Sequence, residues 1–132
     1  MKSRILFISA HRQDARRLSE MLHALPLQLH HAPSLDKARI RLHQHNYKVI
    51  LTEAALPDGK WLDVLDLARD CPKDTEVIVT DPQADACFWA EALNRGAYDL
   101  LAQPFYEPEV RRILYNACTR PRYQPVTMTA TS

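Results

Sequence analysis

The sequence has little of three things that often reveal a protein's partners or surroundings: excess charge, cysteine and long apolar runs. Its 132 residues contain 17 lysines and arginines against 16 aspartates and glutamates, which leaves a net charge of +1. A chain so close to neutral has no global field to attract nucleic acid or an anionic membrane. Its choice of partner must therefore depend on a local surface.

The few cysteines and the short apolar runs restrict where the protein works. Cys71, Cys87 and Cys118 are odd in number and lack CxxC spacing, which predicts reduced thiols rather than a disulfide framework. The apolar run at the N-terminus is too short for a secretory signal, and none later is long enough to span a bilayer. We therefore expect a cytoplasmic protein.

An apolar share of 46% and a charged share of 25% are ordinary for a globular domain. A chain of this length can bury one core without disulfides or metals. We assign residues 1–118 to that domain. Residues 119–132 contain proline and threonine but no apolar period, which predicts a flexible C-terminal tail.

The stretch from Tyr47 to Gly59 contains the predicted central strand and the first candidate site residue. Val49, Ile50 and Leu51 form an apolar run too short for a helix, which is typical of a strand buried on both faces of a parallel sheet. Glu53 stands where this strand ends. Because ligands gather beyond the carboxyl ends of such strands, Glu53 is either a site residue or a solvated carboxylate.

Strands and helices alternate along the chain. Short apolar runs predict five strands, at residues 5–8, 27–32, 49–53, 76–80 and 98–102. Helical spacing follows each, with Pro26 ending the first helix, Ser34 capping the second and Gly96 ending the fourth. The fold class is α/β: a flavodoxin-like, doubly wound sandwich of five parallel strands and five helices.

Several residues at the predicted strand ends then match a known family. The landmarks, in order, are Glu53, Pro57, Thr80, Gly96-Ala97 and Gln103-Pro104-Phe105. Over roughly residues 4–118 the chain resembles the receiver domain of response regulators, the CheY-like superfamily. The resemblance implies the strand order 2-1-3-4-5, a role in two-component or phosphorelay signalling, and no enzymatic activity of its own.

The residues that a receiver uses for phosphorylation are mostly absent. By resemblance, Ser9 and Ala10 stand at the positions of the acidic pair, and Glu53 stands at the position of the acceptor aspartate. Gln103 takes the place of the lysine that contacts the phosphoryl group, and Leu100 that of the aromatic switch residue. Thr80 keeps the family's hydroxyl, and with Leu100 it marks the switch-equivalent positions. The pocket around Glu53 is expected to consist of Ser9, Ala10, His11, Thr80, Asp81, Gln103 and Pro104.

These replacements predict an atypical or pseudo-receiver. Magnesium prefers oxygen ligands, so loss of two carboxylates should abolish or weaken its binding, and we expect no cofactor and no metal. Gln103 removes a cation that phosphoryl transfer needs, and the longer Glu53 misplaces the attacking oxygen. Glu53 then either imitates a phosphorylated acceptor by taking a hydrogen bond from Thr80, or sits in a domain fixed in one conformation. We favour the second, since a carboxylate lacks the phosphoryl group's second charge.

Three alternatives stay open. The first is a receiver still phosphorylated, on Glu53. The second is a flavodoxin-like small-ligand binder, although residues 9–13 make a poor phosphate cradle. The third is a different metal site, with His11 and the loop residues Asp58 and Asp81 near Glu53. The remaining histidines are expected at the surface.

A protein partner is expected on the fourth helix, fifth strand and fifth helix, the usual output face by resemblance. Charges of both signs there suit a homodimer: Glu91, Arg95, Asp99, Arg111 and Arg112. A solvated face explains them equally well. The chain ends too soon after Cys118 for a DNA-binding output domain, so we expect a single-domain regulator or one domain of a longer protein.

Overall fold

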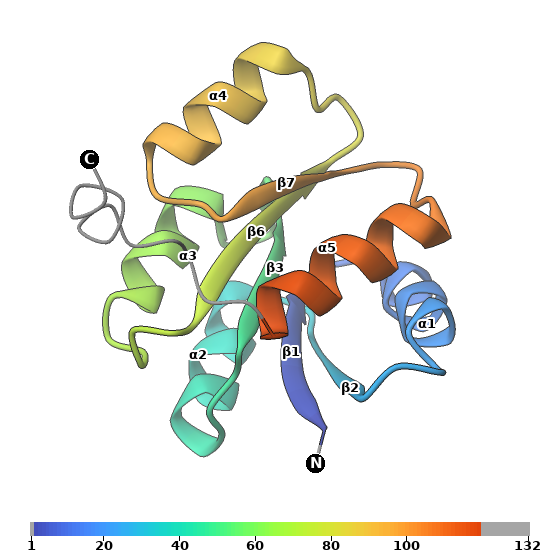
Figure 1. Cartoon of the computed structure of the whole chain (residues 1–132). Coiled ribbons are helices and arrows are strands. Elements are labelled where there is room, and N and C mark those ends of the chain that lie inside the picture. The colour runs from blue at the N-terminus through green and yellow to red at the C-terminus, as the bar shows by residue number, and fades with distance from the viewer. Residues whose placement is uncertain (1, 120–132) are drawn as a thin grey trace, which may run out of the picture.

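The five apolar runs become the strands of one sheet. In the computed structural model, which describes residues 2–119, they pair in parallel in the order β2-β1-β3-β6-β7 (Figure 1). Their bounds are β1 (Ser3–Ile8), β2 (Leu27–Ala32), β3 (Val49–Glu53), β6 (Glu76–Asp81) and β7 (Asp99–Ala102). With β6 and β7 as the fourth and fifth strands of the sheet, this confirms the predicted order.

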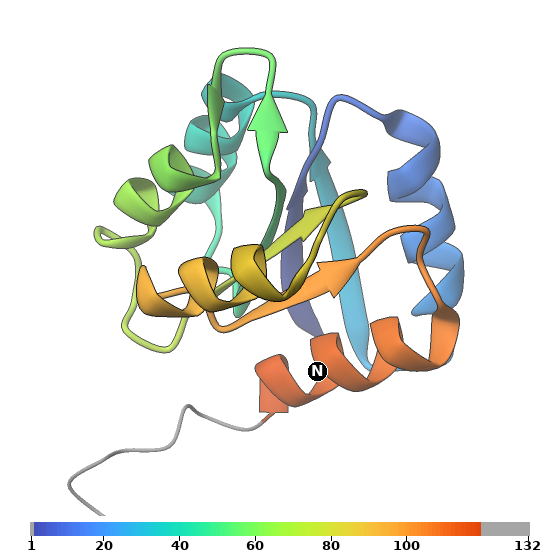
Figure 2. The same cartoon turned by 90° about the horizontal axis from the view of Figure 1, so that it is seen from above.

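Five helices cover the sheet on both faces. They are α1 (Arg12–Met21), α2 (Leu35–Gln44), α3 (Trp61–Ala68), α4 (Ala86–Asn94) and α5 (Glu107–Thr119). Helices α1 and α5 lie on one face, and α2, α3 and α4 lie on the other (Figure 2). The predicted flavodoxin-like architecture is therefore confirmed. Within residues 2–119, every helix is too short or too polar to cross a bilayer.

Alternate residues of the central strands feed the two halves of the core. Ile5 and Phe7 of β1 pack with α1 and α5, whereas Leu6 and Ile8 pack with α2 and α3. All four side chains are fully buried. Burial of each leucine or isoleucine contributes about 1.5–3 kcal/mol, so β1 and β3 form a rigid base for whatever follows their carboxyl ends.

One local prediction was wrong. The first helix ends at Met21, five residues before Pro26, because the backbone beyond it turns: the His23 amide donates to the Glu20 carbonyl and the Leu25 amide to the Leu22 carbonyl, each three residues back. After Glu53 the chain forms a small antiparallel hairpin of β4 (Ala55–Leu56) and β5 (Gly59–Lys60), which turns at Pro57 and Asp58. Such two-residue strands are too short to leave an alternating pattern in the sequence.

The predicted helix ends are otherwise confirmed. The Ser34 hydroxyl caps α2 by accepting from the Lys37 amide at 3.2 Å. Four apolar residues at helical spacing on α5 are buried: Val110, Ile113, Leu114 and Ala117. Helix α5 extends to Thr119, and the rest of the expected tail lies outside the described residues.

Gly96 ends α4 through its backbone conformation. Its φ is +109°, a region that favours glycine. The Gly96 amide donates to the Leu93 carbonyl and the Ala97 amide to the Ala92 carbonyl, which together form a Schellman motif. A Cβ atom added here would meet nothing within 4 Å, so strain alone opposes a side chain.

We therefore predict that Gly96→Ala lowers the free energy of unfolding by about 1–2 kcal/mol, as expected for a non-glycine residue in a sparsely populated backbone region. Urea unfolding at pH 7 measures the change. The matched control is Ser19→Ala on the exposed side of α1, which should change stability by at most about 0.5 kcal/mol. Equal effects of the two substitutions would contradict the role assigned to Gly96.

Candidate functional site

A hollow of about 360 Å³ lies at the carboxyl ends of the strands. Register places Glu53, the last residue of β3, beside Thr80 of β6. The residues that line it are His11, Asp14, Glu53, Ala54, Ala55, Thr80, Asp81, Pro82 and Gln103. The structure thus brings together His11, Glu53, Thr80, Asp81 and Gln103 among the residues expected there.

Glu53 is buried, with 8% of its surface exposed, and it is paired. The Nδ1 atom of His11 lies 3.0 Å from Glu53 Oε2 and 3.2 Å from Oε1. The hydrogen bond to Glu53 and the charge of that carboxylate raise the pKa of His11. The sequence placed His11 in this pocket and near Glu53, but it did not predict that the two side chains pair directly.

The loop after β1 holds His11 in place. The Ser9 hydroxyl accepts a hydrogen bond from the His11 amide at 2.9 Å, and His31 Nε2 donates to the Ser9 carbonyl oxygen at 2.7 Å. Ser9 is fully buried, whereas Ala10 is exposed. Ser9 therefore shapes the loop instead of replacing a metal ligand.

Thr80 does not donate to Glu53, so one of the two states considered for Glu53 is not the one observed. Its hydroxyl donates to the Leu101 carbonyl at 2.7 Å and accepts from Gln103 Nε2 at 3.1 Å. Thr80 and Gln103 therefore satisfy each other. Pro104 lies beyond Gln103, with Phe105, at a neighbouring hollow that Arg17 also lines.

The acidic residues of the pocket differ from those expected. Asp58 was expected to approach Glu53, but its carboxylate accepts from the amides of Leu35 and Asp36 at the start of α2. The Leu35 bond is the main cause of the lowered pKa of Asp58. Asp14, which was missed, lines the pocket instead. The sequence feature that could have identified Asp14 is its three-residue spacing from His11, which places both side chains on one side of the first turn of α1.

Electrostatically the pocket is anionic. Asp14, Glu53 and Asp81 contribute carboxylates, His11 contributes the one titratable base, and no lysine or arginine is among the described residues that line it. The His11 nitrogen and one carboxylate oxygen each from Asp14 and Glu53 lie within 4.8 Å of one another. This is a set of atoms that can hold a cation.

The expectation of surface histidines was wrong for His30 and His31. Besides the bond of His31 to Ser9, His30 Nδ1 lies 2.7 Å from the Tyr47 hydroxyl, with its ring edge-on to Tyr47 and His45. Burial is the main cause of the lowered pKa of His30. Neither ring lines the pocket: His31 supports the loop that presents His11, whereas His30 packs against Tyr47 and His45.

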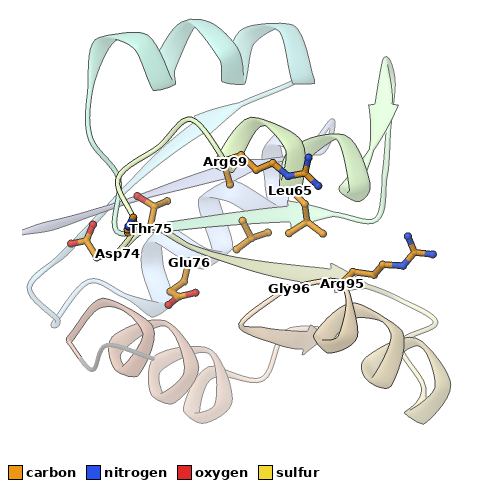
Figure 3. Close-up of a pocket in the computed structure, with 10 residues that line it drawn as sticks. Leu65, Arg69, Asp74, Thr75, Glu76, Arg95 and Gly96 are labelled. Atoms are coloured by element: carbon orange, nitrogen blue, oxygen red, sulfur yellow. The ribbon is translucent and has the colours of Figure 1, made fainter. Parts of the chain in front are cut away.

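A larger hollow, of about 500 Å³, opens at the amino end of β6 (Figure 3). Leu65 of α3, Arg69 just beyond α3 and Arg95 just beyond α4 line it. Three of its charged side chains pair with near neighbours: Arg69 with Asp66, Arg95 with Glu91, and Asp74 with Lys48. Because these groups do not converge on one point, the smaller pocket at Glu53 is the better candidate site.

The expected interaction face carries exposed aromatic rings. Trp89 of α4 is 48% exposed and donates to Asp99 at 3.2 Å, and Tyr106 and Tyr115 are exposed on the α5 side. Glu91 pairs with Arg95 within α4, and Arg111 pairs with Glu107 within α5, while Arg112 is exposed. Leu100, at the switch-equivalent position, is half-buried and packs against the core between α3 and α4.

The His11–Glu53 pair predicts a pH dependence. A base with a raised folded-state pKa stabilises the protein below its unfolded pKa of about 6.5, and this contribution is lost as the pH rises through the folded value. Glu53→Gln should therefore lower the pKa of His11, measured by NMR titration, and flatten stability between pH 5.5 and 8. Glu20→Gln, an exposed carboxylate of α1, should leave both unchanged. An unchanged His11 titration in Glu53→Gln would show that the pair does not form.

Comparison with known proteins supplies structural neighbours only. No protein-family model matches the sequence, and no curated protein is significantly similar to it. Among solved structures, the receiver domain of the Francisella response regulator 1452 is 19% identical, with a TM-score of 0.80 over 90% of this chain and 98% of that one. A two-component response regulator from Clostridium difficile is 18% identical, with a TM-score of 0.79 over 90% and 98%. The beryllofluoride-activated NtrC4 receiver domain dimer is 24% identical, with a TM-score of 0.73 over 86% and 92%. The chain therefore has the fold of response-regulator receiver domains.

Proposed function

We propose that the chain is an atypical receiver domain of a two-component or phosphorelay-type system that is not phosphorylated and acts by binding protein. It is a binding module of the cytoplasm rather than an enzyme. The observation that carries this proposal is the state of Glu53, which stands at the acceptor position already paired with His11 in a pocket lined by two further carboxylates.

Charge opposes a phosphoryl group in this pocket. Such a group carries roughly −1.5 to −2 charges at neutral pH and needs cations to neutralise it during transfer. Here it would meet Asp14 and Asp81, with Gln103 at the lysine position. Both oxygens of Glu53 already contact His11, so attack by this carboxylate would first require breaking that pair.

Magnesium affinity is lost or weak for a related reason. The ion demands near-octahedral oxygen ligation, usually from carboxylates and waters. At the positions of the acidic pair, the Ser9 hydroxyl is committed to the His11 amide, and Ala10 has no ligand to offer. The phosphoryl donor therefore lacks the ion that would orient it.

The binding surface is the face formed by α4, β7 and α5. Exposed Trp89, Tyr106 and Tyr115 supply the aromatic anchors that interfaces favour. Paired charges surround them, from Glu91 and Arg95 on α4 and from Glu107 and Arg111 on α5. A self-complementary, twofold contact suits this mixture, and one structural neighbour is described as a receiver dimer.

Acetyl phosphate with magnesium should leave the protein unmodified, as measured by intact mass, and beryllofluoride should not shift its amide NMR spectrum. A receiver domain that has the acceptor aspartate serves as the positive control under the same conditions. A phosphoryl adduct on the wild type that disappears in Glu53→Gln would overturn the proposal, because it would show that Glu53 accepts phosphate.

Trp89→Glu should weaken self-association at least about tenfold, since it places a charge in the centre of the proposed contact. Sedimentation velocity over a concentration series measures the change. Ile40→Glu is the matched control, because Ile40 is similarly exposed, at 46%, but lies on α2. If the wild type stays monomeric throughout, the partner on this face is another protein and the homodimer is excluded.

A further inference from the structure

The cluster of His11, Asp14 and Glu53 has the composition of a metal site of a different kind from that of a receiver. We propose that these three side chains bind a first-row transition-metal dication, with Zn²⁺ as the probe. The ion would replace the proton that His11 shares with Glu53. The proposal uses the pocket described above but does not depend on its being closed to phosphorylation.

The spacing of the three ligand atoms is close to what zinc requires. Ligands about 2.0–2.2 Å from a tetrahedral zinc ion stand roughly 3.3–3.6 Å from one another. His11 Nδ1 and Glu53 Oε2 are 3.0 Å apart, and the oxygen of Asp14 lies within 4.8 Å of both. Asp14 is half-buried in the first turn of α1, and a change of its side-chain rotamer can bring its carboxylate oxygen toward the other two ligand atoms.

The surroundings hold two of the ligands before any ion arrives. Glu53 is the buried end of a central strand, and the Ser9 hydroxyl fixes the backbone of His11. His31 in turn holds the Ser9 carbonyl. Preorganisation of this kind lowers the entropy cost of binding.

Charge favours a dication here. With His11 neutral, the pocket carries the charges of Asp14, Glu53 and Asp81, and no lysine or arginine among its described lining residues offsets them. The partial positive charge at the N-terminus of α1 opposes a cation, but it is worth only half an elementary charge against three full ones.

The ligand types select a transition metal over magnesium. An imidazole nitrogen with two carboxylates suits zinc and its neighbours, whereas magnesium requires a shell of oxygens. Three protein ligands also leave one tetrahedral position for water. All candidate side-chain ligands lie within the described residues, because residue 1 and residues 120–132 contain no histidine, cysteine, aspartate or glutamate.

Isothermal titration of the whole chain with ZnCl₂ at pH 7.5 tests the proposal. We expect one equivalent to bind the wild type, and affinity to fall at least about tenfold in each of His11→Gln, Asp14→Asn and Glu53→Gln. Two buffers of different ionisation enthalpy should reveal proton release, and affinity should fall at pH 5.5, where His11 is protonated. Millimolar Mg²⁺ should not compete.

Two variants control for adventitious binding. His23→Gln removes an exposed imidazole just after α1, and Cys87→Ser removes the exposed thiol of α4, so neither should change the affinity. Thermal melting without metal verifies that each variant is folded, and zinc should raise the melting temperature of the wild type but not of His11→Gln. Absence of binding, binding unaffected by His11→Gln, or equal competition by Mg²⁺ would each overturn the proposal. None of these outcomes bears on the acetyl phosphate experiment, which is run without zinc.

Discussion

A buried carboxylate at the end of the central strand must find a counter-charge, and the arrangement of this pocket follows from that requirement. An unpaired charge removed from water costs several kcal/mol, so Glu53 is compatible with the fold only when a cation or proton reaches it. His11 meets this need from the start of α1. The loop that presents His11 depends in turn on the buried hydroxyl of Ser9 and on His31. Ser9 therefore positions the side chain that pairs with Glu53.

The side chains of the pocket form two separate hydrogen-bonded groups, one around Glu53 and one around Thr80. His11 takes both carboxylate oxygens, while Thr80 turns to the Leu101 carbonyl and to Gln103. Within residues 2–119, no side-chain hydrogen bond joins Glu53 to Thr80, although β3 and β6 pair through their backbones. Leu100, packed against the core, offers no ring or hydroxyl that could change partners. These contacts favour one resting conformation, which is what a constant binding surface on α4, β7 and α5 requires.

The fold could be predicted from the sequence because strands buried on both faces leave uninterrupted apolar runs. Ile5 to Ile8 and Val49 to Leu51 are such runs, and Gly96 marks a helix end by its backbone conformation alone. The site could be predicted only in part. Strand ends identified Glu53 and Thr80, but which carboxylate reaches Glu53 depends on how α1 and the hairpin pack. That is why Asp14 was missed and Asp58, a cap of α2, was misplaced.

The residues at Ser9, Ala10, Glu53 and Gln103 are best explained together, by their combined effect on the charge of the pocket. By the resemblance to receivers, Ser9 and Ala10 stand where an acidic pair is expected and bring no negative charge. Neutral Gln103 stands where a lysine is expected and donates to Thr80. The one buried carboxylate of the pocket, Glu53, pairs with His11, and this hydrogen bond raises the pKa of the imidazole. The metal site that we propose would exchange a proton for a metal ion, because both are cations that His11 and Glu53 can share. In the function that we propose, the pocket resists a phosphoryl group, because such a group would add negative charge where Asp14 and Asp81 already supply it.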